Sequence, residues 1–377
     1  MISVWEKETF YSPQDIVIIG SGFAGLWSAF YLKKRSPRLK ITIVDRGIIP
    51  TGASTKNAGF ACFGSLTELL ADEQRAGTEK MLELAAMRYK GLEMIRSCFP
   101  SKEIDMDMCG GYELFTPKEN NITSDLEQQI DYLNELLQPI LKKKPFKLAD
   151  KKIDSFRFKK VIHLIRNDLE GYLHSGKLLN VLLHQVRLMG VQVLNNIEIK
   201  KFEKINDRVQ LETNHAINLS AGQLLICVNG FARQLIPDLD VEPARGQILL
   251  TSPIKNLPWK GTFHYQQGYY YFRNLGNRVL LGGARNLALS EEKTYSLETT
   301  PVIQNELERF LKQVVIPDQE YSIESRWSGT MGIGTEKMPI LKEISPDIFC
   351  CVRMSGMGVA LAPVAGEMVA SMMMRSK

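Results

Sequence analysis

The chain has 377 residues, a formal net charge of +5 and 44% hydrophobic residues. This length and apolar content allow two domains or one large composite with a sizeable core, and they exclude a low-complexity or disordered chain. The net charge is small for the length, although residues 142–160 are locally basic and leave an acidic or RNA partner open as an alternative to a solvated face.

Cysteine usage and the absence of targeting signals predict a cytoplasmic protein. The six cysteines lack paired metal-ligand spacing and several lie in apolar runs, so we expect buried thiols in a reducing compartment and no metal site. The N-terminal residues show no basic segment followed by an apolar core. No apolar run reaches membrane-spanning length, so we expect no transmembrane segment.

A glycine-rich turn follows the first apolar strand, in DIVIIGSGFAG at residues 15–25. Gly20 permits a tight turn, Gly22 lets the backbone approach a pyrophosphate, and Gly25 lets the following helix pack closely on the strand. The amide groups at the helix start then face the phosphates. A second apolar strand, KITIVDRG, ends in Asp45, whose carboxylate can accept hydrogen bonds from a ribose. This order favours dinucleotide binding over an ordinary βαβ turn.

Small residues fill the loop after the second strand. The segment TGASTKNAGFACFG, residues 51–64, keeps backbone amides accessible. Such a loop suits a flat polar heterocycle that needs hydrogen bonds at its edge, with a plain Gly/Ser loop as the alternative.

Periodicity predicts the remaining elements: helices over 65–100 and 119–145, a strand at 110–117, and a helix followed by strands after Gly171. The chain is therefore expected to leave the nucleotide-binding sheet near Ser65 and to return near Gly171. Three alternating segments, EPARGQILLTS, GTFHYQQGYYYFRN and NRVLLGGAR, predict strands of an antiparallel sheet. The segment DIFCCVRMSGMGVALAPVAGEMVA then repeats the order of strand, glycines and helix.

Four of these motifs together resemble the FAD-dependent amine and D-amino-acid oxidoreductase family, which includes glycine oxidase, sarcosine oxidase and γ-glutamylputrescine oxidase. GSGFAG with Asp45 resembles the family's ADP-binding motif, and GASTKNAG resembles its GASGRNAG flavin loop. PARGQ, residues 243–247, resembles PVRGQ, and SGMGVALAPVAGEMVA resembles the C-terminal SGHGxxxAPxxGxxxA segment. The match runs nearly end to end.

The resemblance implies an α/β fold with a Rossmann-like FAD-binding domain and a discontinuous α+β substrate domain built on an antiparallel sheet. Residues 1–70, 168–238 and 325–377 are expected to form the FAD-binding domain. Residues 71–167 and 239–324 are expected to form the substrate-binding domain.

The resemblance also implies FAD as a non-covalent cofactor, because WSGTMG, residues 327–332, lacks the cysteine that sarcosine oxidase-like relatives place after this strand. The adenosine end would lie near Asp45 and the isoalloxazine between the two glycine-containing loops. The expected cofactor contacts are Gly20, Gly22, Phe23, Ala24, Gly25, Asp45, Arg46, Ala53, Ser54, Lys56, Asn57, Ala58, Gly59, Ile199, Asn229, Gly230, Gly356, Met357, Gly358, Val359 and Ala360.

On the substrate side the sequence departs from the family. Members that oxidise free amino acids commonly read WAGLRPGT, and that arginine binds the substrate carboxylate. Met331 takes the arginine position here, and a thioether cannot replace a bidentate guanidinium. We therefore expect an amine substrate without an arginine-anchored α-carboxylate, unless Arg326 or Arg273 replaces the missing residue.

Other pocket candidates are aromatic or basic. Tyr271 and Trp327, with Tyr269, Phe263 and Tyr265, form either an aromatic lining for an amine or simply the covered face of the sheet. Lys56 stands where relatives often carry arginine, and it either stabilises reduced flavin or pairs with a phosphate or carboxylate. Lone histidines are expected to be structural, with His264 the least secure.

The sequence thus predicts oxidation of a C–N bond in an amine or amino acid by hydride transfer to flavin N5, followed by hydrolysis of the imine. Oxygen or an unknown carrier would accept the electrons. Two alternatives remain: an FAD-dependent dehydrogenase of a hydroxy acid or polyol, and a non-catalytic flavoprotein that binds RNA or protein.

Overall fold

The computed structural model describes residues 1–119 and 125–375. The chain divides into two compact units. Unit 1 comprises residues 1–55, 176–243 and 331–377, and unit 2 comprises residues 56–175 and 244–330. Three segments expected in the FAD-binding domain, residues 56–70, 168–175 and 325–330, thus lie in unit 2, and residues 239–243, expected in the substrate-binding domain, lie in unit 1. The assignment of a cofactor or a substrate to either part stays a prediction.

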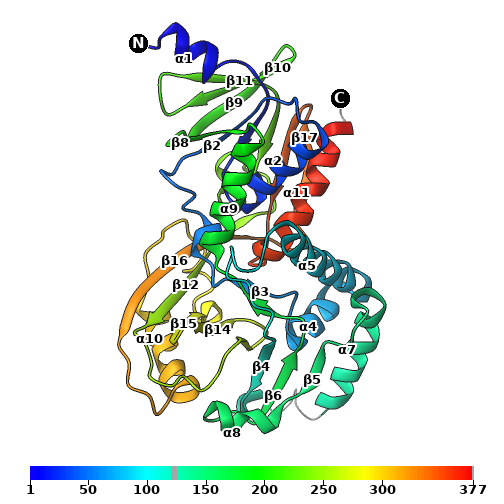
Figure 1. The fold of residues 1–377 in the computed structure, drawn as a ribbon, viewed down its shortest axis with the longest axis vertical. Coiled ribbons are helices and arrows are strands. Elements are labelled where there is room, and N and C mark those ends of the chain that lie inside the picture. Colours follow the sequence, from blue (N-terminus) through cyan, green and yellow to red (C-terminus); the bar gives the residue numbers. More distant parts are fainter. Residues whose placement is uncertain (120–124, 376–377) are drawn as a thin grey trace. The chain divides into compact units, whose positions relative to one another are not determined.

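Unit 1 is built on a largely parallel sheet (Figure 1). Its elements are α1 (Val4–Thr9), β1 (Gln14–Ile19), α2 (Phe23–Arg35), β2 (Ile41–Asp45), α9 (Ser175–Leu188), β8 (Gln192–Asn195), β9 (Ile199–Ile205), β10 (Arg208–Thr213), β11 (Asn218–Ile226), the short helical segment η3 (Asn229–Gln234), β17 (Ile340–Ser345), β18 (Ile348–Val352) and α11 (Gly358–Arg375). In the described residues the strands follow the order β17-β18-β11-β1-β2-β8, with β10 and β9 continuing from β11. Strand β1 pairs in parallel with both β11 and β2.

Strand β1 is buried along most of its length because both faces of this sheet are covered. Helices α2 and α11 lie side by side (Figure 1). A Cβ added at Gly366 would lie 2.8 Å from the backbone nitrogen of Ser28 and 2.8 Å from Trp27 Cβ. The glycine therefore permits the close approach of α11 to α2.

Unit 2 is built on a mainly antiparallel sheet. Its elements are β3 (Phe60–Ala61), α4 (Leu66–Ala76), α5 (Thr78–Cys98), β4 (Gly111–Phe115), η1 (Pro117–Glu119), α7 (Leu126–Leu141), β5 (Phe146–Leu148), η2 (Asp150–Lys152), α8 (Ile153–Phe156), β6 (His163–Asn167), β7 (Gly171–Tyr172), β13 (Thr262–Tyr265), β14 (Tyr270–Leu275), β15 (Arg278–Gly283), η4 (Arg285–Leu287), α10 (Pro301–Phe310) and η5 (Leu311–Val315). Helix α3 (Ala53–Lys56), the start of α9, and strands β12 (Glu242–Thr251) and β16 (Ile323–Ile333) each include a point where the chain passes between the units.

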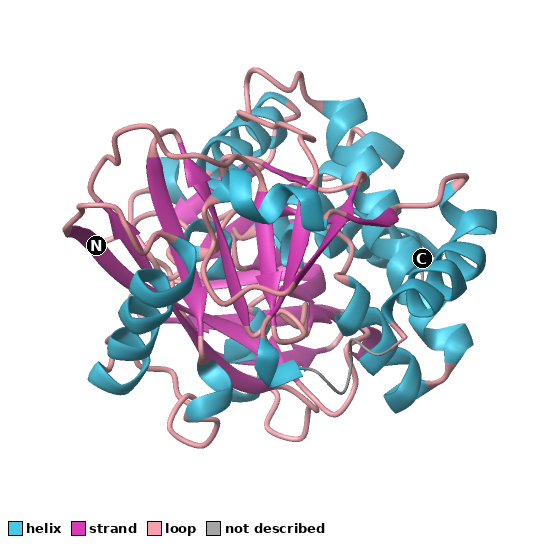
Figure 2. Cartoon of the chain, turned by 90° about the horizontal axis from the view of Figure 1, so that it is seen from below, coloured by secondary structure: helices cyan, strands magenta, loops and turns pink. Residues whose placement is uncertain are grey.

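The strands of this second sheet follow the order β16-β12-β15-β14-β13-β4-β6-β5 in the described part of the chain. Figure 2 separates these strands from the helices by colour. One face carries an apolar core that includes Phe263, Phe272 and, from α10, Leu307. On the other face, α4, α5 and α7 cover the β4, β6 and β5 end through a core that includes Phe63 and Leu133. The neighbouring part of that face, over β12, β15 and β14, carries the side chains described below.

Candidate functional site

The first glycine turn in unit 1 has the geometry that the motif predicts. Gly20 has φ +103°, its N–H donates to the Val44 carbonyl at 2.8 Å, and an added Cβ would lie 2.7 Å from the Cys227 carbonyl oxygen. A Cβ at Gly25 would lie 2.0 Å from the Gly20 carbonyl oxygen. Both positions therefore exclude a side chain, and α2 packs directly on the turn.

Ser54 completes the start of α2. The N-cap residue Gly22 has no side chain to cap the helix, and the Phe23 N–H instead donates to Ser54 Oγ at 2.9 Å. A Cβ at Gly22 would meet only the Ser54 side chain, at 3.0 Å from Oγ. The turn is thus bare apart from one hydroxyl, as backbone approach by a pyrophosphate requires.

Asp45 and Arg46 lie at the end of β2. One oxygen of Asp45 accepts hydrogen bonds from the Ser21 N–H at 2.8 Å and hydroxyl at 2.6 Å, and the other accepts from the Gly47 N–H at 2.9 Å. The guanidinium of Arg46 stacks 4.0 Å from the ring centroid of Phe231 in η3. Asp45 therefore holds the glycine turn itself, and its contact with a ribose stays a prediction.

The second glycine turn precedes α11. Gly356 has φ +82°, and the preceding Ser355 N–H donates to the Gly332 carbonyl at 3.0 Å. Asn229 Oδ1 accepts from the Met354 N–H at 3.1 Å, and a Cβ at Gly356 would lie 3.4 Å from Met331 Sδ. The structure thus brings Asn229, Met331 and Gly356 together within unit 1.

These two turns fit an extended dinucleotide. Each leads into a helix of more than ten residues, whose first amide groups have no acceptor within the helix itself, as at every helix start. Ile199, by contrast, places its side chain in the apolar core of unit 1. Its contribution to cofactor binding is limited to its backbone in our prediction.

The loop that resembles the flavin motif continues into unit 2, where hydrogen bonds fix it. Asn57 Oδ1 accepts from the Gly59 N–H at 2.8 Å and from the Ser175 hydroxyl at 2.5 Å. The Gly59 carbonyl accepts from the Leu173 N–H at 2.8 Å. From β16, the indole N–H of Trp327 donates to the Lys56 carbonyl at 3.1 Å.

An apolar cluster joins this loop to the sheet. Ala58 packs with Ile248 and Leu280, and the partly buried side chains around them are Phe60, Leu250, Tyr271 and Trp327. Tyr271 lies against Gly282, where an added Cβ would lie 2.5 Å from the phenol ring. Burial raises the pKa of Tyr271 to about 12, so its phenol stays neutral. Among the predicted pocket residues, the structure therefore assembles Lys56, Tyr271 and Trp327.

Arg273 lies on the same face of β14 as Tyr271. Its side chain is 4% exposed and stacks 4.7 Å from the ring centroid of Tyr172. The guanidinium lies next to Gly59 of the flavin-motif loop, because a Cβ added at Gly59 would be 3.3 Å from Arg273 Nη2. Burial lowers the pKa of Arg273 to about 10.

Other predicted side chains lie elsewhere in unit 2. Phe263 is fully buried and stacks on Phe272 at 4.7 Å, and Tyr265 stacks on Phe310 at 5.0 Å, both in the apolar core of the opposite face. Tyr269 packs against the same core. Arg326 already has a counterion, because its guanidinium contacts Glu308 at 2.6 Å.

Sequence reasoning missed a buried polar cluster beside the site. His264 Nε2 lies 3.1 Å from Glu170 Oε2, and the His264 ring lies edge-on to Phe60 at 5.2 Å. Cys62, Glu170 and His264 are the group of potential metal ligands found among the described residues. Burial raises the pKa of the Cys62 thiol well above its ordinary value, so the metal-binding thiolate is disfavoured.

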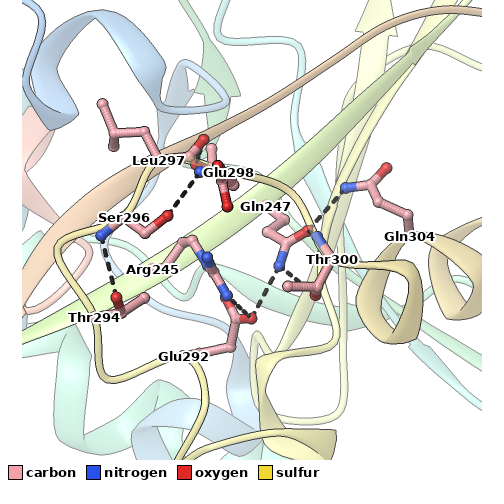
Figure 3. A network of polar contacts seen from close by, with 10 residues as sticks. Arg245, Gln247, Glu292, Thr294, Ser296, Leu297, Glu298, Thr300 and Gln304 are labelled. Atoms are coloured by element: carbon pink, nitrogen blue, oxygen red, sulfur yellow. Dashed lines mark hydrogen bonds and ion pairs between the residues drawn. The ribbon is translucent and has the colours of Figure 1, made fainter.

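The PARGQ motif anchors a long loop. Arg245 makes two hydrogen bonds to Glu292, at 2.8 and 2.7 Å, while Gln247 donates to Glu292 at 2.9 Å and to the Thr300 hydroxyl at 2.9 Å (Figure 3). Both members of the ion pair are buried. The motif therefore fixes the segment that precedes α10, and nothing in the sequence pointed to Glu292 as its partner.

In the described part of the chain, no helix combines the length and apolar character needed to cross a membrane. All six cysteines are free thiols, and Cys62, Cys227, Cys350 and Cys351 are buried. The expectation of buried thiols is thus confirmed for these four.

Comparison with known proteins yields one family and several relatives. The family model described as "FAD dependent oxidoreductase" (DAO) matches residues 15–372. A probable oxidoreductase OrdL of Rhizobium meliloti (strain 1021) is 24% identical over 369 residues, which cover 95% of this chain and 82% of the relative. The gamma-glutamylputrescine oxidoreductase of Escherichia coli (strain K12) is 21% identical over 370 residues, covering 95% of this chain and 83% of the relative.

Solved structures share the fold. L-proline dehydrogenase from P. horikoshii has a TM-score of 0.75 at 19% identity, covering 97% of this chain and 94% of the other. Glycine oxidase from Bacillus cereus ATCC 14579 has a TM-score of 0.74 at 16% identity, covering 97% of this chain and 98% of the other. The fold class and the family resemblance expected from the motifs are both confirmed.

Proposed function

Because the chain belongs to the FAD-dependent oxidoreductase family, we propose that it oxidises the carbon–nitrogen bond of an amine or amino acid. The observation that carries this proposal is the similarity over 95% of the chain to a relative named for an amine derivative, gamma-glutamylputrescine oxidoreductase. The chemistry of the residues in unit 2 agrees with it.

FAD is the cofactor of the family, and the residues of unit 1 fit it. The turns at Gly20–Gly25 and Gly356–Ala360 would hold it without a covalent bond. When bound, FAD supplies a hydride acceptor for the carbon next to the substrate nitrogen. Oxygen or another carrier then takes up the electrons.

The residues of unit 2 would position the substrate and offer it an apolar surface. The indole N–H of Trp327 donates to the Lys56 carbonyl and so restrains the loop that carries the Lys56 charge. The cluster around Ala58 and Leu280 excludes water. The neutral phenol of Tyr271 offers a hydrogen-bond donor near an amine without adding a charge. Together these groups favour an amine bound in its neutral form, whose lone pair assists loss of the hydride.

Residue 331 favours a substrate whose α-carboxylate is not held from β16. Met331 brings a thioether where related amino-acid oxidases carry arginine, and a thioether offers no charge and only weak hydrogen bonding. An α-carboxylate bound at this residue would lack a counterion. We therefore assign Met331 an apolar contact with the substrate.

The basic segment at residues 142–160 gives less support to an RNA-binding function. Lys147 forms an ion pair with Asp168, and Lys159 contacts Asp318 at 2.6 Å. The aromatic residues between the lysines, Phe146, Phe156 and Phe158, are buried in the unit 2 cores. Base stacking on exposed aromatic side chains, which single-stranded RNA binding commonly uses, therefore has no counterpart in this segment.

Anaerobic reduction of the purified holoprotein tests the proposed function. Matched amines, N-alkyl amines, amino acids and hydroxy acids are mixed with the protein, and the flavin absorption band is followed. We expect bleaching by amines or amino acids, with release of ammonia or a primary amine. Bleaching by hydroxy acids alone would replace the proposal with a C–O dehydrogenase, and no bleaching by any of these compounds would count against it. Admission of air then shows whether oxygen restores the colour.

A further inference from the structure

Arg273 is a buried cation that has no hydrogen-bond or ion-pair partner among the described residues. Its side chain is 4% exposed, yet it forms no hydrogen bond and no ion pair within residues 1–119 and 125–375. Both Nε and Nη1 are buried and unpaired. Its guanidinium stacks on the ring of Tyr172. Burial of a guanidinium without an anion is costly, so such a group points to a missing ligand.

The other buried arginines show what is missing. Arg88 contacts Glu68 at 3.1 Å, Arg245 contacts Glu292 at 2.7 Å, and Arg353 forms an ion pair with Asp240. Each of these three has a carboxylate partner supplied by the chain. Among the buried arginines of the described residues, Arg273 differs from them in lacking one.

The location of Arg273 places the missing anion at the candidate site. Tyr270 and Phe272 point into the apolar core, so Tyr271 and Arg273 share the opposite face of β14. The guanidinium lies beside Gly59 of the flavin-motif loop, and Leu280, which pairs with Arg273 across β14 and β15, belongs to the cluster that contains Ala58. The unpaired cation is thus next to the residues to which we assign substrate positioning.

The surroundings of Arg273 match a monoanion. Of the ionisable groups that influence it most, Tyr172 and Cys109 stay neutral because burial raises the pKa of each, and the Asp105 carboxylate adds a negative charge; no second cation is among them. A phosphate dianion needs more positive charge than one guanidinium supplies. A carboxylate carries one negative charge, and its two oxygens can accept two parallel hydrogen bonds from the planar guanidinium.

We propose that Arg273 binds a carboxylate of the substrate, so that the substrate is an amine that also carries a carboxylate, held from β14 instead of β16. That the substrate is an amine rests on the proposed function, whereas the carboxylate site at Arg273 does not. It revises the expectation drawn from Met331 that the substrate has no arginine-anchored carboxylate, and it selects Arg273 over Arg326, which is already paired.

Binding of simple probes to the holoprotein tests the site without turnover. Acetate, propionate and butyrate are compared with acetamide, propionamide and butyramide by isothermal titration calorimetry. We expect the carboxylates to bind more tightly than the amides, and Arg273→Gln to weaken carboxylate binding by at least ~30-fold. Arg273→Lys keeps the charge but loses the fork, so it should weaken binding by about tenfold. The control Arg278→Gln, at a half-buried arginine on β15 that pairs with Glu324, should bind as the wild type does.

Stability separates a binding role from a structural one. Removal of an unpaired buried charge should leave the ligand-free Tm of Arg273→Gln equal to or above that of the wild type, whereas loss of a structural arginine would lower it. Equal affinity for carboxylates and amides in the wild type, unchanged carboxylate binding in Arg273→Gln, or a large fall in its Tm would each overturn the proposal. Phosphate binding in preference to propionate would overturn it as well.

The substrate series then distinguishes the two proposals. If amines reduce the flavin but Arg273→Gln has no effect on carboxylate binding, only the Arg273 inference fails. If propionate binding depends on Arg273 but no amine or amino acid reduces the flavin, only the proposed function fails. A series of α-, β- and γ-amino acids in the reduction assay gives the spacing between the carboxylate and the reacting carbon.

Discussion

Arg245 and Glu292 form a two-pronged ion pair in which both side chains are buried. Strand β12 supplies the arginine and the loop before α10 supplies the glutamate, 47 residues later in the chain (Figure 3). Gln247 donates to the same carboxylate and extends the network to Thr300. The PARGQ motif is thus a clamp on a loop of unit 2.

The buried ion pair between Arg245 and Glu292 predicts that a single substitution lowers stability strongly. Glu292→Gln removes the negative charge and leaves the Arg245 guanidinium buried beside a neutral amide, so the free energy of unfolding should fall by about 3 kcal/mol. Thermal and urea unfolding measure this difference. The exposed neighbour Glu291 provides the control, and Glu291→Gln should change stability little. Equal stability of the two variants would mean that the ion pair contributes nothing.

Gly22→Val should yield colourless protein. The added Cβ would lie 3.0 Å from Ser54 Oγ, and the two further methyl groups would occupy the bare turn that we assign to the pyrophosphate. Flavin content per chain, measured from the absorption spectrum, checks this. Gly52→Ala, in the same region but with nothing within 4 Å of its added Cβ, should keep its flavin. Normal flavin content in Gly22→Val would contradict the assignment of the first turn.

His264 should contribute to stability in a pH-dependent way. Burial by itself lowers the pKa of His264, but the facing carboxylates of Glu170, Glu113 and Glu68 outweigh burial, and its pKa is raised above 6.5. A raised folded-state pKa means that the protonated ring stabilises the fold fully below 6.5, and that this contribution is lost as the pH rises through the folded-state value. The Tm difference between wild type and His264→Gln should therefore shrink in alkaline buffer. The exposed His184 gives a control, since His184→Gln should show no such trend.

The elements that depend on local sequence were predictable. Apolar periodicity over residues 65–100 predicted helix, and the structure has α4 and α5 there. The segment GTFHYQQGYYYFRN read as a single alternating strand, whereas the structure divides it into β13 and β14. Gln266 and Gln267 adopt positive φ in the connecting turn, which glutamine rarely does, so no turn residue except Gly268 signalled it.

The site was predictable only as far as its motifs reach. Alternation along β13 and β14 separates Phe263 from His264, but it does not tell which face is the apolar core. The sequence therefore left open whether Phe263 and Tyr265 line a pocket or form the covered face of the sheet, and the structure places both in the core. Partners far apart in the sequence, such as His264 and Glu170 at a separation of 94 residues, require the folded chain.

Met331 offers a direct test of the substrate side. Met331→Arg restores the guanidinium that related amino-acid oxidases carry, and we expect the ratio of kcat/KM for small α-amino acids to that for matched amines to rise by about tenfold. Met331→Leu keeps an apolar side chain of similar size and should leave the ratio unchanged. Steady-state kinetics with each amino acid and its decarboxylated amine measure the ratio.

The same substitution in the Arg273→Gln protein carries the comparison further. If the two arginines serve the same carboxylate, Met331→Arg should recover part of the α-amino-acid activity that Arg273→Gln loses. If Arg273 holds a carboxylate more distant from the nitrogen, Met331→Arg should favour α-amino acids while the activity on longer amino acids stays lost. If Met331→Arg leaves the ratio of kcat/KM for amino acids to that for amines unchanged in both the wild type and Arg273→Gln, the α-carboxylate does not bind at residue 331. Arg273 would then be the residue that selects the substrate.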